Sequence, residues 1–123
     1  MGMLGDGLAA MVKTDGSVVS LYDDKAGGFS NMTGALSPHV TQKDWQWLSI
    51  PEVDCKTIVL CSDGVADDLK DTAGFVKEFA DAHRELSSVS AARHTRKMLQ
   101  NWPTPKHSDD KTIVCLLREE VEE

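Results

Sequence analysis

The sequence predicts an α+β fold in which an antiparallel β-sandwich is flanked by helices. Four or five short apolar runs with strand character come first, two amphipathic helical segments follow, and one more apolar run closes the order. Strands and helices do not alternate regularly, which argues against a doubly wound parallel sheet. An Asp-Gly dipeptide joins the first two runs and favours the tight turns between antiparallel strands.

The first predicted element is a hairpin. Leu8–Val12 is apolar throughout, "TDG" at Thr14–Gly16 supplies the turn, and Ser17–Tyr22 is the returning strand.

Three further strands are predicted along the chain. Trp45–Ile50 is a candidate strand that ends at Pro51. Thr57–Cys61 is short, β-branched and wholly apolar, as expected for a strand in a buried sheet. A last strand is predicted at Thr112–Leu117.

Two helices are predicted before the last strand. In Thr72–Leu86, residues at three- and four-residue spacing form one face: Ala73, Val76, Phe79, Ala80 and His83. Asp71 or Thr72 is suited to cap this helix, and Ser88 to cap the second one. The face expected for the second helix consists of Val89, Ala92, Leu99 and Trp102, and Pro103 and Pro105 end it.

Composition limits the classes of function. The 123 residues suit one domain, and the net charge of −7 argues against nucleic acid or an anionic membrane as partner. The acidic stretch at 119–123 is expected to be a solvated tail. Three cysteines without a CxxC pair indicate reduced, buried thiols in a cytoplasmic protein, and no apolar run reaches the ~18 residues of a membrane span.

Carboxylates gather where two predicted strands end and begin. In "TIVLCSDGVADDL", Asp63 and Asp67 follow a strand, and Gly64 is expected to let the chain turn sharply. In "HSDDKTIVCL", Asp109 and Asp110 precede the last strand. If these two strands lie antiparallel, Asp63 and Asp109 face each other at one edge of the sheet.

Such a cluster indicates a cation site. Clustered carboxylates repel one another unless a positive charge lies among them. Oxygen ligands suit Mg²⁺ or Mn²⁺, whereas zinc prefers histidine and cysteine. Each motif taken alone is also ordinary turn chemistry.

The two stretches resemble signature stretches of the protein phosphatase 2C family of metal-dependent serine/threonine phosphatases. In that family an apolar strand ends in Ser-Asp-Gly-x-x-Asp, and Asp-Asn or Asp-Asp later precedes a final strand. "LGDGLAAMVKTDG" (Leu4–Gly16) and "NMTGAL" (Asn31–Leu36) are similar to further segments of the family, in the same order.

The resemblance implies a role for individual residues. Asp63, Asp109 and Asp67 match metal-ligand or near-metal aspartates, and Asp110 stands where the family often has asparagine, in a supporting position. Asp6 is expected on a central strand and is not assigned as a ligand. The parent reaction would be hydrolysis of phosphoserine or phosphothreonine in proteins by a water activated between two Mg²⁺ or Mn²⁺ ions.

Two family elements have no counterpart in this sequence: the N-terminal acidic stretch and the Asp-Gly-x-Gly-Gly loop. "DKAGG" (Asp24–Gly28) follows the central strand, so it is rejected as that loop. Residues 1–118 are therefore interpreted as the C-terminal half of a phosphatase domain, with little activity alone. Its uncovered sheet edge and apolar face would be hidden by an N-terminal half or by self-association.

Two alternatives remain open at this point. The chain could be a non-catalytic relative that serves as a regulatory or binding module, or a generic interaction domain with coincidental Asp turns.

His107, two residues before Asp109, is either an exposed loop residue or a contact to phosphate or water. The three tryptophans, Trp45, Trp47 and Trp102, are expected to be packing residues.

Overall fold

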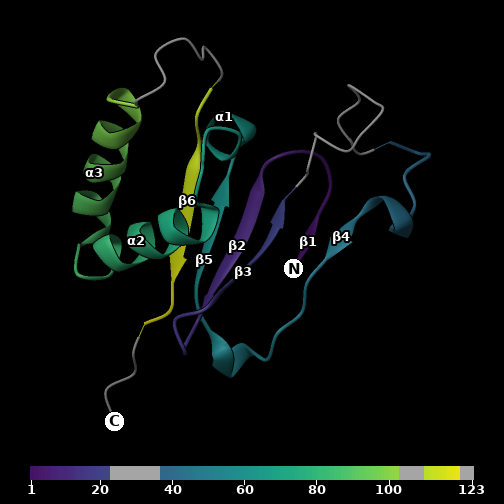
Figure 1. Ribbon diagram of the computed structural model, residues 1–123, viewed down its shortest axis with the longest axis horizontal. Helices are drawn as coiled ribbons and strands as arrows, with labels where there is room; N and C mark the ends of the chain where they lie inside the picture. Colours follow the sequence, from purple (N-terminus) through teal and green to yellow (C-terminus); the bar gives the residue numbers. More distant parts are fainter. Residues whose placement is uncertain (23–36, 103–109, 120–123) are drawn as a thin grey trace.

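A computed structural model describes residues 1–22, 37–102 and 110–119 of the chain. Its centre is a four-stranded antiparallel sheet in the order β3-β2-β5-β6 (Figure 1). The strands are β2 (Leu8–Lys13), β3 (Val18–Tyr22), β5 (Cys55–Cys61) and β6 (Ile113–Leu117). Every pairing in this sheet is antiparallel, as the sequence predicts.

The predicted hairpin is confirmed. β2 and β3 pair from Leu8 opposite Tyr22 to Val12 opposite Val18. Gly16 has a φ of 87°, a conformation that glycine adopts without steric cost, which explains the glycine in the turn.

A separate two-stranded ribbon pairs β1 (Gly2–Met3) with β4 (Gln46–Trp47). The strand expected over 45–50 is thus reduced to two residues. Short 3₁₀ turns lie on either side, η2 (Gln42–Asp44) and η3 (Glu52–Asp54). Trp47 stacks on Trp45, as expected for a packing residue, although it is 60% exposed.

Three helices complete the described chain: α1 (Asp63–Ala66), α2 (Thr72–Arg84) and α3 (Ser88–Gln100). Asp71 caps α2, because its side chain accepts a hydrogen bond of 3.0 Å from the Gly74 N–H. The cap of α3 is Ser87 rather than Ser88, since the Ser87 hydroxyl accepts from the Ser90 N–H. No helix among the described residues is long and apolar enough to cross a membrane.

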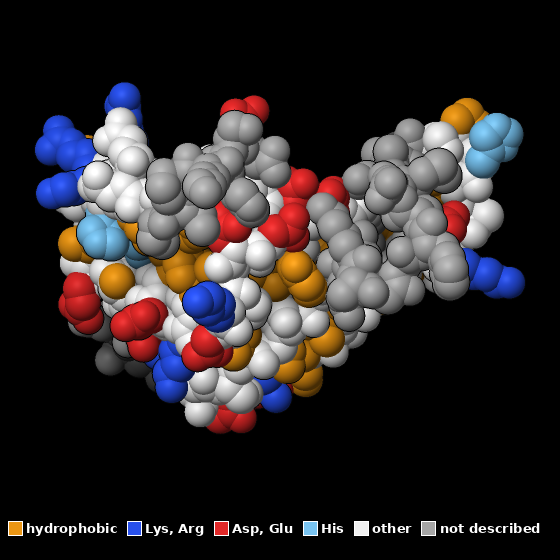
Figure 2. Space-filling model, turned by 45° about the horizontal axis from the view of Figure 1, so that its top comes forward, with side chains coloured by type: hydrophobic (Ala, Val, Ile, Leu, Met, Phe, Trp, Pro, Cys, Tyr) orange, Lys and Arg blue, Asp and Glu red, His pale blue; other side chains and the backbone are white. Residues whose placement is uncertain are grey.

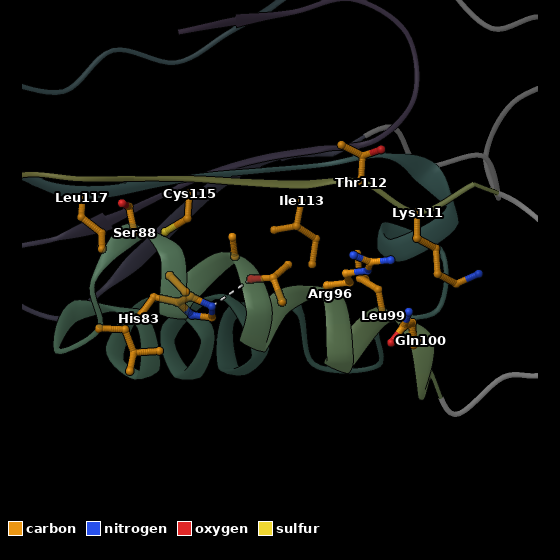
Figure 3. Close-up of a pocket in the computed structure, with 14 residues that line it drawn as sticks. His83, Ser88, Arg96, Leu99, Gln100, Lys111, Thr112, Ile113, Cys115 and Leu117 are labelled. Atoms are coloured by element: carbon orange, nitrogen blue, oxygen red, sulfur yellow. Dashed lines mark hydrogen bonds between the residues drawn. The ribbon is translucent and has the colours of Figure 1, made fainter.

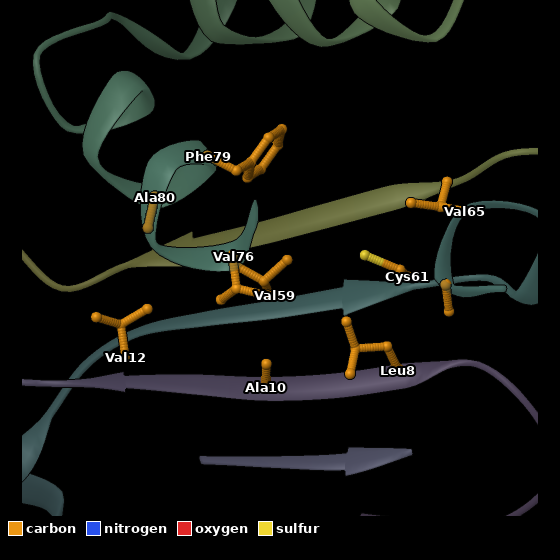
Figure 4. Packing of buried hydrophobic residues seen from close by; sticks show 10 residues of the cluster. Leu8, Ala10, Val12, Val59, Cys61, Val65, Val76, Phe79 and Ala80 are labelled. Carbon is orange, nitrogen blue, oxygen red and sulfur yellow. The ribbon is translucent and has the colours of Figure 1, made fainter. Parts of the chain in front are cut away.

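The core lies between the sheet and α2. Alternate side chains of β2 and β5 point towards the helix layer and meet Val76, Phe79 and Ala80 of α2 (Figure 4). His83 belongs to the same face, as predicted, and is only 2% exposed. Ala73, also expected on this face, is exposed.

The cysteines are free thiols, as predicted, but they differ in burial. Cys61 is buried, and Cys55 and Cys115 are half-buried. Burial and, to a smaller extent, the neighbouring Cys115 together raise the pKa of the Cys61 thiol to about 12. Burial also raises the pKa of Cys115, against a smaller opposing effect of Arg84.

The other face of the sheet is apolar as well. The register places eight side chains there: Ala9, Met11, Val19, Leu21, Ile58, Leu60, Val114 and Leu116. Those on β2 are buried, whereas Leu60, Val114 and Leu116 are 39–56% exposed. Sheets with two apolar faces are normally covered on both sides. The described residues form no second large sheet over this face, so the two-layered sandwich remains a prediction.

Candidate metal centre

The end of β5 delivers Asp63 to one end of the sheet. Ser62 leaves the strand as the N-cap of α1, and its carbonyl accepts hydrogen bonds from the N–H groups of Val65 and Ala66. Asp63 is the first helical residue and is half-buried. Gly64 lies buried inside this turn and has no positive φ, so the turn after Asp63 does not use a backbone conformation that only glycine adopts easily.

The second predicted stretch lies directly beside the first. β5 and β6 run antiparallel with Cys61 opposite Ile113. The Ser62 N–H donates to the Thr112 carbonyl at 3.0 Å. The Ser62 hydroxyl accepts from the Thr112 N–H at 2.9 Å and donates to the Asp110 carbonyl at 3.3 Å. Ser62 therefore ties the two carboxylate-bearing stretches together, as their predicted antiparallel arrangement requires.

Asp109 and His107 lie outside the described residues. The expected pairing of Asp63 with Asp109 therefore stays a prediction. The same holds for "DKAGG" at 24–28 and for "NMTGAL" at 31–36. Asp110 is described and is exposed, immediately before β6.

Asp6 also lies at this end of the sheet, which corrects the expectation that it sits on a strand. β2 begins at Leu8, opposite Cys61, so Asp6 precedes β2 where Asp63 follows β5. Gly7 has a φ of 119°, and a Cβ there would lie 2.7 Å from the Cys61 carbonyl oxygen. A side chain at position 7 would therefore push these two chain segments apart.

The signal for Asp6 was present in the sequence. Glycines on both sides, Gly5 and Gly7, have positive φ values and mark a bend, not a strand interior. The neighbouring strands β2, β5 and β6 thus each bring an aspartate to the same end: Asp6, Asp63 and Asp110. Figure 2 shows acidic side chains gathered on the face of the molecule that contains this end of the sheet.

Asp67 and Asp68 are held by aromatic side chains. The Tyr22 hydroxyl, at the end of β3, donates to Asp67 Oδ1 at 3.2 Å. The Trp102 indole N–H donates to Asp68 Oδ2 at 2.8 Å, and the Trp102 ring packs edge-on against Phe75. Trp102 is therefore a packing residue, as predicted, with an additional hydrogen bond that fixes the segment after α1.

The atoms that could coordinate a metal ion at this end of the sheet are carboxylate and carbonyl oxygens. Oxygen ligands of this kind suit Mg²⁺ or Mn²⁺ better than zinc. Within the described part of the chain, no three acidic, histidine or cysteine side chains are arranged closely enough to hold a metal ion.

Comparison with known proteins identifies the protein family of the chain. The sequence model of the family described as protein phosphatase 2C matches residues 1–102. The chain therefore belongs to the protein phosphatase 2C family. The match includes Asp6, Asp63 and Asp67 and ends before the stretch that holds Asp109 and Asp110. No curated protein and no solved structure matches the chain.

Proposed function

We propose that this chain supplies one side of the metal centre of a phosphoserine/phosphothreonine protein phosphatase. Membership of the family supports phosphatase-type chemistry in general. The observation that carries the proposal for this chain is the tie through Ser62, which holds the Asp63 and Asp110 stretches at one end of the sheet.

In this proposal Asp63, Asp67 and Asp109 hold Mg²⁺ or Mn²⁺, and Gly64 and Asp110 support them. When bound, the ions would supply an activated water and positive charge that neutralises the phosphoryl oxygens. Asp63 is placed by the first turn of α1 and Asp67 by Tyr22. Both residues are thus positioned by the fold, which lowers the cost of ordering them when an ion binds.

In this proposal the chain forms only part of the phosphatase domain, and another polypeptide segment completes it. Residues 1–118 form the C-terminal half, and 119–123 form an acidic tail. The partners are a phosphorylated protein substrate and either an N-terminal half or a second copy. The exposed Leu60, Val114 and Leu116 support this division, because an apolar sheet face of this kind is normally covered.

Mn²⁺ titration by isothermal calorimetry tests the ligand assignment. We expect weak, saturable binding that is lost in Asp63→Asn. Asp81→Asn is the matched control, since Asp81 is an exposed aspartate on α2, and it should bind Mn²⁺ as the unaltered chain does. Absence of binding, or equal binding by Asp63→Asn, would contradict the assignment.

A phosphatase assay tests the division into halves. The chain alone, with Mn²⁺ and p-nitrophenyl phosphate, should show little or no turnover. Robust turnover would show that the chain holds a complete centre and would overturn the half-domain proposal.

One observation favours a second candidate, a non-catalytic phosphatase-like binding module. The carboxylates of Asp67 and Asp68 accept hydrogen bonds from Tyr22 and Trp102, which is a structural use of acidic residues near the site. For such a module, Asp67→Ala, which removes the acceptor of the Tyr22 hydroxyl, would lower the free energy of unfolding and leave Mn²⁺ binding unchanged. If Asp67 is a metal ligand instead, the same substitution would weaken Mn²⁺ binding and change the free energy of unfolding little.

A further inference from the structure

Helix α3 stands away from the sheet. None of its residues is buried, although Met98 and Leu99 reach the edge of the core. In Figure 1, α3 lies beyond β6, on the side away from β5. The residues expected to form its apolar face, Val89 and Ala92, are exposed, so that expectation is wrong for half of the face.

A groove of about 790 Å³ separates α3 from β6 (Figure 3). Ile113, Cys115 and Leu117 line it on the strand side, and Ala91 and Leu99 line it on the helix side. The groove opens beside the sheet edge that the N-terminal half or the second copy of the proposed phosphatase domain would cover. It therefore belongs to that interface, whereas the outward face of α3 does not.

The outward face of α3 is basic. Arg93, Arg96, Lys97 and Gln100 follow one another at three- and four-residue spacing, which places them on one face of the helix. All four side chains are exposed. In Figure 2, Lys and Arg side chains gather at the upper left of the molecule, the side on which Figure 1 places α3. The three cations, Arg93, Arg96 and Lys97, are called the basic stripe.

The charge of this helix is opposite to that of the chain. The chain has a net charge of −7, yet it contains no Asp or Glu between Glu85 and Asp109. Helix α2 carries two cations and two carboxylates, whereas α3 carries three cations and no carboxylate. Positive charge is thus concentrated on the helix that packs least against the rest of the structure.

The basic stripe does not stabilise its own helix. Arg93 lies three residues before Arg96 and four before Lys97, and like charges at this spacing repel. The residues at the same spacing on either side are uncharged: Val89, Ser90, Gln100 and Asn101. The helix dipole favours a cation at Lys97 in the last turn but not at Arg93 in the middle of the helix. Within the described part of the chain, no carboxylate forms an ion pair with any of the three cations. The stripe is therefore suited to an anion from outside the helix.

We propose that the basic stripe of α3 docks an acidic segment of a partner polypeptide. Guanidinium groups bind both carboxylates and phosphate groups through paired hydrogen bonds, so glutamate, aspartate or phosphoserine can supply the anions. The excess negative charge of the chain disfavours nucleic acid and anionic membranes, because the rest of the surface would repel such extended polyanions. A short acidic segment contacts the stripe alone. The site lies outside the proposed metal centre and does not depend on it.

Fluorescence anisotropy with short labelled peptides, recorded without Mn²⁺, tests the site. One peptide alternates serine with glutamate, a second has phosphoserine in place of glutamate, and a neutral control has glutamine there. We expect saturable binding of an acidic peptide at least about tenfold tighter than that of the control, and weaker binding as salt is added. The tighter of the two acidic peptides identifies carboxylate or phosphate as the anion that the stripe prefers.

Charge reversals on the two helices provide matched variants. Arg93→Glu and Arg96→Glu should each weaken binding at least about fivefold. Lys77→Glu, an equal reversal at an exposed position of α2, should leave it unchanged. Binding that persists in Arg93→Glu and Arg96→Glu, or that falls equally in Lys77→Glu, would overturn the proposal.

The melting temperature of Arg93→Glu separates docking from a role in helix stability. This variant replaces two repulsive pairs in α3, with Arg96 and Lys97, by two attractive ones. Circular dichroism should therefore show an equal or higher melting temperature while binding falls. A lower melting temperature would assign the stripe to the stability of the helix and would contradict docking.

Deletion of residues 119–123 distinguishes a partner from the acidic tail of the chain itself. Peptide binding should change by less than about twofold, because the stripe is expected to be open in the unaltered chain. A gain of about tenfold or more would show that the tail occupies the stripe, and would overturn docking of a partner. So would tighter binding of a single-stranded oligonucleotide of equal charge, or the absence of saturable peptide binding at low salt.

Discussion

Helices α2 and α3 have the same length, 13 residues, and both are amphipathic, but they relate to the sheet in opposite ways. Val76, Phe79 and Ala80 of α2 are at most 5% exposed, whereas α3 has no buried residue. His83 joins the two helices, because its Nδ1–H donates to the Phe79 carbonyl and its Nε2 accepts from the Thr95 hydroxyl. An apolar stripe therefore indicates a helix, but whether its side chains are buried depends on how closely the helix packs against the sheet.

Truncation of one side chain on each helix should give the largest difference. Phe79→Ala leaves a cavity in the core and should lower the free energy of unfolding by about 3–5 kcal/mol. Leu99→Ala, beside an open groove, should cost about 1 kcal/mol, since little buried contact is lost. Urea denaturation followed by circular dichroism measures both. Equal losses would show that α3 packs as tightly as α2.

Removal of the hydroxyl that connects the helices should have an intermediate effect. Thr95→Val takes away the hydrogen bond of 2.9 Å to His83 Nε2 and leaves a buried imidazole nitrogen unsatisfied. The expected loss is about 1–2 kcal/mol in the free energy of unfolding. Thr95→Ser keeps the hydroxyl and is the control. If both variants unfold at the same urea concentration, the hydrogen bond does not hold α3 to α2.

The reactivity of two cysteines should show the same difference in packing between α2 and α3. Cys61 belongs to the core beneath α2, and Cys115 lines the groove beneath α3. At pH 8 the raised pKa values keep both thiols protonated, and iodoacetamide reacts with thiolates. Mass spectrometry should show slow labelling of Cys115 and still slower labelling of Cys61. Labelling of Cys61 ahead of Cys115 would contradict the difference in packing.

The Cys61 thiol should also give a pH dependence of stability. Its pKa is about 12 in the folded chain and 9.0 at its ordinary value. Below pH 9 both states keep the proton, and stability is then lost as the pH rises from about 9 towards 12, because the unfolded state ionises first. Cys61→Ala should lose less stability than the unaltered chain when urea midpoints are compared at pH 8 and 10.

Much of the fold follows from local sequence signals. The apolar run before Ser62 predicts β5, the Asp-Gly turn predicts the first hairpin, and the cap at Asp71 predicts the start of α2. The stretches that contain Asp63 and Asp110 could be predicted to lie side by side, because two antiparallel strands allow few arrangements of their ends. These features depend on short segments whose own periodicity or turn chemistry decides the outcome.

Other features depend on tertiary context that local patterns do not contain. The exposure of Val89 and Ala92 depends on how far α3 stands from β6, which no helical periodicity reveals. The two-residue length of β4 depends on its partner β1, because a strand extends as far as its pairing does. The resemblance of Leu4–Gly16 to a central strand of the family suggests that Asp6 lies on a strand, whereas Gly5 and Gly7 bend the chain there.

The link through Ser62 has a consequence for synthesis of the chain. Its hydrogen bonds to the Asp110 and Thr112 backbone join residues 48 and 50 positions apart. A ribosome adding 5–20 residues per second needs roughly 2.5–10 s to cover that distance. Throughout this interval β5 is an unprotected edge strand, because β6 has not yet emerged. The acidic end of the sheet therefore closes only after β6 emerges, and the newly made chain is most exposed to misassociation just before that moment.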